Sequence, residues 1–299
     1  MRGAVLAALC LAQAPSPTPA PPTFRVEAEA VELDVSVTQG DKPVSGLTAA
    51  DFVVRDSGVP QDIELATAGT LPLKLILSLD TSASMAGERL TRLHSGADAL
   101  LGDLREGDRA ALISFSHRVR VLEGLSHDLA AVRGRLDAVA PDGMTALNDA
   151  LYTSLALAEG AAGRCALVLF SDGLDNISWT SEADVLDAAR LSPAVVYVVA
   201  SSLAKPRAED RKHVARDPRE AFLRKLTDVT GGKVIKADSD ADLVAAFGRV
   251  LPELRTRYVL RYAPQGVPDA GWHSIEVKLK GRKGEVRTRP GYLRAASQH

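Results

Sequence analysis

Residues 73–85 read Leu73-Lys74-Leu75-Ile76-Leu77-Ser78-Leu79-Asp80-Thr81-Ser82-Ala83-Ser84-Met85, an apolar run that ends in Asp-x-Ser-x-Ser. The run has too few polar positions for a half-exposed antiparallel strand and is too short to span a membrane. It therefore predicts a strand at the centre of a parallel sheet that is covered on both faces. Ligands of such sheets bind beyond the carboxyl ends of the strands. The stretch thus places an acid and two hydroxyls where a ligand would bind.

The Asp-x-Ser-x-Ser ending favours a cation as that ligand. In an extended segment alternate side chains point the same way, so Asp80, Ser82 and Ser84 are expected to converge. Three oxygens around one point suit a hard cation such as Mg²⁺ or Ca²⁺. By itself the pattern also fits a strand followed by a polar turn, because Asp and Ser favour turns through local hydrogen bonds.

Two later stretches of the sequence favour the interpretation of a cation-binding site. In residues 142–151 a turn containing glycine precedes a helix, and Thr145 lies at or near the N-cap with its hydroxyl facing the site. Residues 166–173 form another buried strand, which ends in Asp172, and this acid is expected to share a crevice with Asp80. The next residues, Gly173 and Asp175-Asn176, are expected to form a helix-capping turn, with contact to a partner as the alternative.

These residues, in this order, resemble the metal-ion-dependent adhesion site of von Willebrand factor type A domains, and the resemblance covers about residues 72–255. It implies that the hydroxyls of Ser82, Ser84 and, in some states, Thr145 touch an ion. Asp80 and Asp172 would bind the ion directly or through water. The ion would be Mg²⁺, or else Ca²⁺ or Mn²⁺, and would hold an Asp or Glu carboxylate of a protein partner. We call this set the five-residue site: Asp80, Ser82, Ser84, Thr145 and Asp172.

The composition of the five-residue site has a physical reason. Two carboxylates about 4 Å apart repel each other by roughly 4 kcal/mol at an effective dielectric constant of 20, and a cation between them removes that repulsion. Because the other three ligands are neutral hydroxyls, a divalent ion would be balanced by only two formal charges. It would remain a good acceptor for one more anionic oxygen.

Strands and helices alternate regularly through residues 71–255, which predicts a doubly wound, mostly parallel α/β domain. The flanks, residues 24–70 and 256–294, have the alternating pattern and turns of β structure. We expect them to pack into one small sandwich-like unit with the α/β domain inserted between them; the alternative is two separate β appendages. The flanks, with their closing Pro290-Gly291-Tyr292, are similar to those of secreted bacterial proteins with this domain.

The N-terminus predicts export. Residues 1–14 have a basic start, a short apolar centre and an Ala-x-Ala ending, as a signal peptide does; a frayed apolar terminus is the alternative. Residues 15–23 form a Pro-rich linker. The mature chain has no segment of the ~20 apolar residues that a membrane helix needs. The sequence therefore predicts a periplasmic or extracellular protein without a transmembrane segment.

Composition and the absence of certain motifs argue against several classes of function. Only 4% of residues are aromatic and the net charge is −2, which argues against nucleic acid as a partner. The chain has no Gly-x-Ser-x-Gly elbow, no phosphate-binding loop and no zinc-like histidine spacing. We expect a binding protein, not an enzyme. The alternatives are a structural module with a loop-rigidifying ion and, third, a metal-dependent hydrolase, which would need a general base beside the ion.

Overall fold

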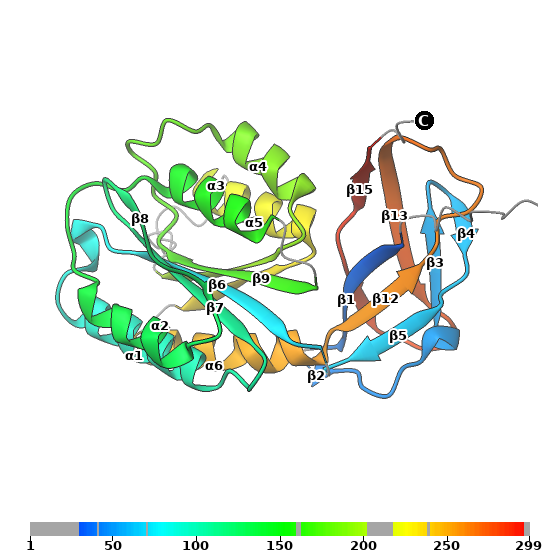
Figure 1. Ribbon diagram of the computed structural model, residues 1–299, viewed down its shortest axis with the longest axis horizontal. Coiled ribbons are helices and arrows are strands. Elements are labelled where there is room, and N and C mark those ends of the chain that lie inside the picture. The colour runs from blue at the N-terminus through cyan, green and yellow to red at the C-terminus, as the bar shows by residue number, and fades with distance from the viewer. Residues whose placement is uncertain are drawn as a thin grey trace, which may run out of the picture.

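The computed structural model describes residues 30–40, 42–69, 71–159, 163–201, 218–237 and 240–295. The expected signal peptide and Pro-rich linker lie outside the described residues. The described chain forms an α/β unit and an antiparallel β unit that lie side by side (Figure 1). Among the described residues, no helix is both long and apolar enough to cross a membrane.

The α/β unit is built on six strands in the order β11-β10-β9-β6-β7-β8. The apolar run forms β6, which pairs in parallel with β7 and β9, and only β8 runs antiparallel at the edge. The predicted doubly wound, mostly parallel sheet is confirmed. The strands span β6 Leu73–Asp80, β7 Arg109–Phe115, β8 Val119–Ser126, β9 Arg164–Ser171, β10 Val195–Ser201 and β11 Lys233–Ala237.

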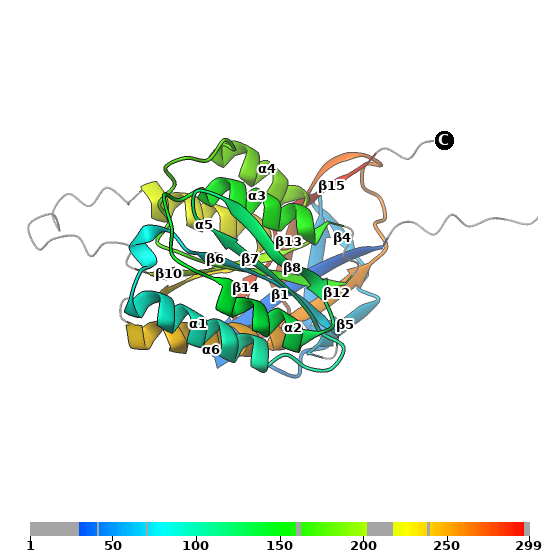
Figure 2. The same ribbon diagram turned by 60° about the vertical axis from the view of Figure 1, so that its left-hand side comes forward.

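Helices cover both faces of this sheet (Figures 1 and 2). One face carries α1 Glu88–Gly102, α2 Leu129–Gly134, the 3₁₀ helix η3 Arg135–Ala138 and α6 Asp240–Thr256, and the other carries α3 Leu147–Ala158, α4 Glu182–Leu191 and α5 Pro218–Thr230. Each layer has its own aliphatic core. After β6 the chain adds strands on both sides, so the carboxyl ends of β6 and β9 border the crevice where such folds bind ligands.

The flanking segments pair with each other. Strand β1 of the N-terminal flank pairs with β12 and β14 of the C-terminal flank, and β3 pairs with β13. Two sheets result, β14-β1-β12-β5 with β2 on β1, and β15-β13-β3-β4, and they enclose a third core. The elements are β1 Val31–Gln39, β2 Lys42–Pro43, the 3₁₀ helix η1 Ala49–Asp51, β3 Phe52–Asp56, β4 Val59–Gln61, β5 Leu65–Ala68, β12 Tyr258–Tyr262, β13 Gly271–Leu279, β14 Glu285–Arg287 and β15 Gly291–Arg294.

A buried cluster of polar side chains connects four strands of the β unit, β3, β12, β13 and β15. His273 is fully buried, and its Nδ1 lies 2.8 Å from Oδ1 of Asp56. The hydroxyls of Tyr262 and Tyr292 donate to the other oxygen of Asp56 at 2.9 and 2.8 Å. A Cβ on Gly291 would lie 2.3 Å from the carbonyl oxygen of His273, so this close approach requires glycine in Pro-Gly-Tyr. His273 is therefore a core residue of the β unit.

Two arginines tie the β unit to the α/β unit through one acid. The guanidinium of Arg257 is fully buried and binds the carboxylate of Asp34, the hydroxyl of Tyr197 and the carbonyl oxygen of Gly231. The carboxylate of Asp34 also accepts from Nε of Arg164 at 3.1 Å, and that side chain is only 4% exposed. Asp34 lies on β1 and Arg164 begins β9, so this cluster joins the two units.

Candidate metal centre

Hydrogen bonds hold the carboxylate of Asp80 in a defined position within the five-residue site. Asp80 ends β6 and is fully buried. Its Oδ1 accepts from the backbone nitrogen of Ser82 at 2.9 Å, and its Oδ2 accepts from the hydroxyl of Ser171 at 2.8 Å. Ser171 ends the neighbouring strand β9, so the parallel pairing of β6 and β9 itself positions the carboxylate.

The two serine hydroxyls converge on each other, with 3.0 Å between their Oγ atoms. From the sequence, we expect an extended backbone from Asp80 to Ser84 to cause this convergence. This is only partly right, because the chain stays extended only to Ser82. The next residues form a 3₁₀ turn, η2 Ala83–Met85, which brings Ser84 back toward Ser82. The side chain of Thr81 points away from the two serines, since its hydroxyl donates to the carbonyl oxygen of Phe115.

The loop that carries Thr145 is hydrogen-bonded to the loop after β6. The backbone nitrogen of Asp142 donates to the oxygen of Thr81 at 2.8 Å, and that of Ala83 donates to the oxygen of Gly143 at 3.0 Å. Gly143 has a φ of +63°, and a Cβ there would lie 2.4 Å from Nδ1 of His117. Thr145 precedes the N-cap, which is Ala146. Thr145 is a buried residue, and within the described part of the chain its hydroxyl forms no hydrogen bond.

Asp172 directly follows β9, and its charge acts on Asp80. Its Oδ1 accepts from the backbone nitrogen of Leu174 at 3.0 Å. Burial raises the pKa of Asp80 above its usual 3.8, and the charge of Asp172 adds to this rise, against hydrogen bonds from Ser82 and Ser171 that lower it. Among residues that the structure describes, no Lys or Arg forms an ion pair with either acid. Among the described residues, the two carboxylates therefore have no ion-pair partner.

This donor set fits a hard divalent cation. It offers carboxylate and hydroxyl oxygens, which Mg²⁺ and Ca²⁺ prefer, and no nitrogen or sulfur. Nowhere in the described ranges, this site included, do three or more His, Cys, Asp or Glu side chains form a group that could hold a metal ion, so the site relies on two carboxylates and its hydroxyls. The residues present are thus consistent with Mg²⁺, Ca²⁺ or Mn²⁺ at the five-residue site.

A second set of residues supports the site, and the sequence shows it only in part. Oδ1 of Asp175 accepts from the backbone nitrogen of Leu147 at 2.9 Å, so Asp175 caps α3. The helix that it caps is thus an earlier one in the chain, while the next helix, α4, is capped by Ser181. Asn176 exchanges two hydrogen bonds with the backbone of Thr145, at 2.9 and 3.1 Å. Asp149, which the sequence does not single out, accepts from the backbone nitrogens of Trp179 and Thr180.

Replacing Asp175 by Ala is expected to destabilise the protein by about 1 kcal/mol, because the first turn of α3 loses its cap. Asp175→Asn keeps a side-chain oxygen and should lose much less. Urea unfolding of the two variants measures the difference. Equal losses in both variants would show that the charge of Asp175, and not its oxygen, is what the helix needs.

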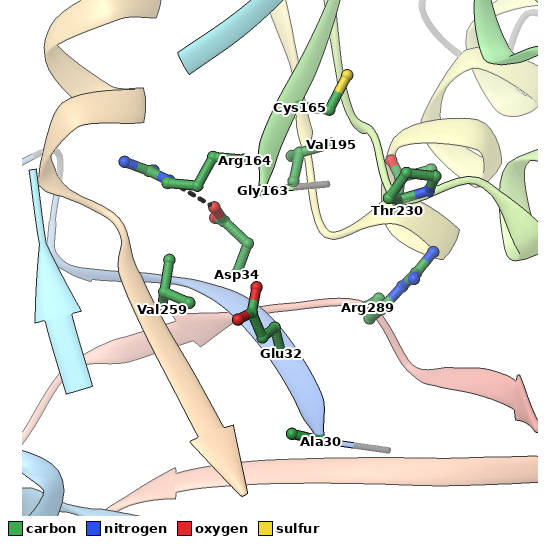
Figure 3. Close-up of a pocket in the computed structure, with 11 residues that line it drawn as sticks. Ala30, Glu32, Asp34, Gly163, Arg164, Cys165, Val195, Thr230, Val259 and Arg289 are labelled. Carbon is green, nitrogen blue, oxygen red and sulfur yellow. Dashed lines mark hydrogen bonds and ion pairs between the residues drawn. The ribbon is translucent and has the colours of Figure 1, made fainter. Parts of the chain in front are cut away.

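A cavity of about 530 Å³ is lined by residues of β1 and of the segments where β9 and β10 begin (Figure 3). Its lining includes Gly163 before β9, Val195 at the start of β10, and Glu32 and Asp34 of β1. These are the amino ends of the sheet strands, whereas Asp80 and Asp172 lie at the carboxyl ends. The cavity wall contains the Asp34–Arg164 ion pair that joins the two units. This cavity therefore belongs to the junction.

Comparisons with known proteins agree with this architecture. Residues 75–174 match the profile of the von Willebrand factor type A domain. An uncharacterized protein of Synechocystis sp. is 36% identical over 96 residues, which are 31% of this chain and 22% of that protein, so the chain spans about a fifth of that relative's length.

Solved structures show the same fold at low identity. A von Willebrand factor type A structure from Catenulispora acidiphila is 12% identical with a TM-score of 0.52, and the match covers 90% of this chain and 73% of that one. The PilB minor pilin from Streptococcus sanguinis is 13% identical with a TM-score of 0.51, over 63% of this chain and 62% of that one. The α/β unit thus has the von Willebrand factor type A fold.

Proposed function

We propose that this chain is a divalent-cation-dependent protein-binding module of an exported bacterial protein, acting in adhesion or assembly. Mg²⁺, or else Ca²⁺ or Mn²⁺, would be held at the five-residue site. When bound, the ion would supply an acceptor for an Asp or Glu carboxylate of a protein partner. The likeness in fold to a minor pilin, a protein named for its place in a pilus, is consistent with a role in assembly.

One observation carries the proposal: Asp80 is fully buried beside Asp172 and no basic side chain of the described chain pairs with either. A buried carboxylate without an opposite charge is costly even when it is hydrogen-bonded, so a fold that keeps one has a use for its charge. The remaining donors are hydroxyls, which add no charge. A divalent ion here would keep its attraction for an incoming carboxylate.

Binding is favoured over hydrolysis by the surroundings of the site. His117 lies against the Gly143 loop, but its Nδ1 faces the carboxylate of Asp142 at 3.7 Å. A hydrolase would need a base aimed at an ion-bound water. Turnover of a generic ester or phosphate substrate that is abolished by both Asp80→Ala and His117→Ala would support the hydrolase instead.

Calorimetric titration with Mg²⁺, Mn²⁺ and Ca²⁺ tests the ion dependence. The parent protein is expected to bind one ion, and Asp80→Ala to bind none. Asp62→Ala removes an exposed acid of the β unit, between β4 and β5, and should titrate like the parent. Equal binding by Asp80→Ala and the parent would place the ion elsewhere and overturn the proposal.

A further inference from the structure

Four large apolar side chains are exposed on the two loops that carry Thr145 and Asp172. Their exposed fractions are 97% for Trp179, 53% for Met144, and 37% for both Leu174 and Ile177. We call these four residues the apolar rim. Scattered apolar residues are normal on a protein surface, but a group of them beside a polar site marks an interaction surface.

Hydrogen bonds place the apolar rim beside the five-residue site. Met144 directly precedes Thr145, and the backbone nitrogen of Leu174 donates to the carboxylate of Asp172 at 3.0 Å. Ile177 follows Asn176, whose backbone nitrogen donates to the oxygen of Thr145 at 2.9 Å. The rim and the site therefore share the same two loops, and a partner that reaches one comes close to the other.

Trp179 is exposed although its backbone is held firmly. Its nitrogen donates to Oδ2 of Asp149 at 3.2 Å, and the nitrogen of Thr180 donates to Oδ1 of the same carboxylate at 2.9 Å. The side-chain amide of Asn148 donates to the oxygen of Thr180 at 3.2 Å. These bonds attach the loop to the first turn of α3. A tryptophan presented on an ordered loop loses little conformational entropy on binding, and this residue type is enriched at interface hot spots.

We infer that the partner binds through an exposed segment in which one Asp or Glu is flanked on both sides by aliphatic residues. This inference rests on the proposed function, because the acid would meet the ion at the five-residue site. The aliphatic neighbours would cover the apolar rim. An acidic segment with polar neighbours would leave Trp179 and Met144 exposed to water. An aliphatic segment without an acid would provide no anionic ligand for the ion.

Short peptides test this chemistry. The first is acetyl-Gly-Leu-Glu-Leu-Gly-amide, which has no aromatic residue of its own. In the second, Ser replaces both Leu, and in the third, Gln replaces Glu. Trp179 reports binding by fluorescence in a Trp272→Phe variant, because the chain has only two tryptophans and the other lies on β13. Each peptide is titrated with saturating Mg²⁺ and with EDTA.

With Mg²⁺ the Leu-Glu-Leu peptide is expected to bind at least about tenfold more tightly than the Ser-Glu-Ser peptide and to shift the Trp179 emission to the blue. The Gln peptide and all EDTA samples should show no binding. In calorimetry on the parent background, Trp179→Ser should remove the tenfold preference. Leu191→Ser is the matched control: that leucine is 57% exposed at the far end of α4 and its loss should change nothing.

The other outcomes separate this inference from the proposed function. Equal affinity for the Leu-Glu-Leu and Ser-Glu-Ser peptides would overturn the inference and leave ion-dependent carboxylate binding intact. Equal binding of the Leu-Glu-Leu peptide in EDTA would also overturn it, since the rim would then act without the ion. If Mg²⁺ titrates the protein but no peptide binds, the inference fails and the ion is structural. If Mg²⁺ itself does not bind, the proposed function fails first.

Discussion

Replacing Asp34 by Ala should lower the free energy of unfolding by about 3–5 kcal/mol, the usual cost of removing one partner from a buried ion pair. The carboxylate of Asp34 is shared by Arg257 and Arg164, whose side chains are 0% and 4% exposed. Without it two guanidinium groups would remain buried at the junction of the two units and would lose the carboxylate that pairs with both. Urea unfolding followed by circular dichroism measures the loss.

Asp98→Ala is the matched control for this variant. Asp98 also binds an arginine, and the two hydrogen bonds from Arg133 are 2.7 and 2.8 Å long. Both side chains are about half exposed, so water replaces the lost bonds and the expected cost is about 0–1 kcal/mol. Similar losses from Asp34→Ala and Asp98→Ala would mean that the junction pair contributes no more than a surface pair.

Replacing Asp80 by Asn is expected to have opposite effects with and without a divalent ion. Burial, with a contribution from the charge of Asp172, raises the pKa of Asp80 above 3.8. Without an ion, the charged carboxylate therefore opposes folding at neutral pH and the variant should be more stable than the parent. With ion at 100 times its dissociation constant, the parent should gain about 2.7 kcal/mol and the variant nothing.

The raised pKa of Asp80 also predicts that the stability of the ion-free protein depends on pH. Because the pKa of Asp80 is higher in the folded state, the folded state holds this proton more tightly than the unfolded state does. The resulting stabilisation is complete below pH 3.8 and is lost as the pH rises through the folded-state pKa. Asp80→Asn should lack this loss. Thermal unfolding in EDTA across this range measures it, and identical curves for the two proteins would contradict the prediction.

Local sequence determined the central part of this protein. The aliphatic run of β6 has no polar face, so it can be stable only between two layers of helices, and this alone indicates a parallel sheet. Asp172 follows β9, whose carboxyl end lies beside that of β6 at the same edge of the sheet, and Thr145 lies in the loop before α3. The order of these residues along the chain thus predicts the five-residue site, and its ion binding remains a prediction.

Contacts between distant residues were decided only by the tertiary structure. Asp34 and Arg257 are 223 positions apart, and no periodicity in either segment identifies the other as its partner. The same holds for Asp56 with His273 and for Asp175, which caps a helix that begins 28 positions earlier. Hydrophobic periodicity fixes which face of an element is buried, but the identity of a polar partner depends on how the finished sheets and loops close around it. The sequence thus determined the fold class and the residues at the strand ends. Tertiary packing alone decided the junction, the capping of α3 and the exposure of Trp179.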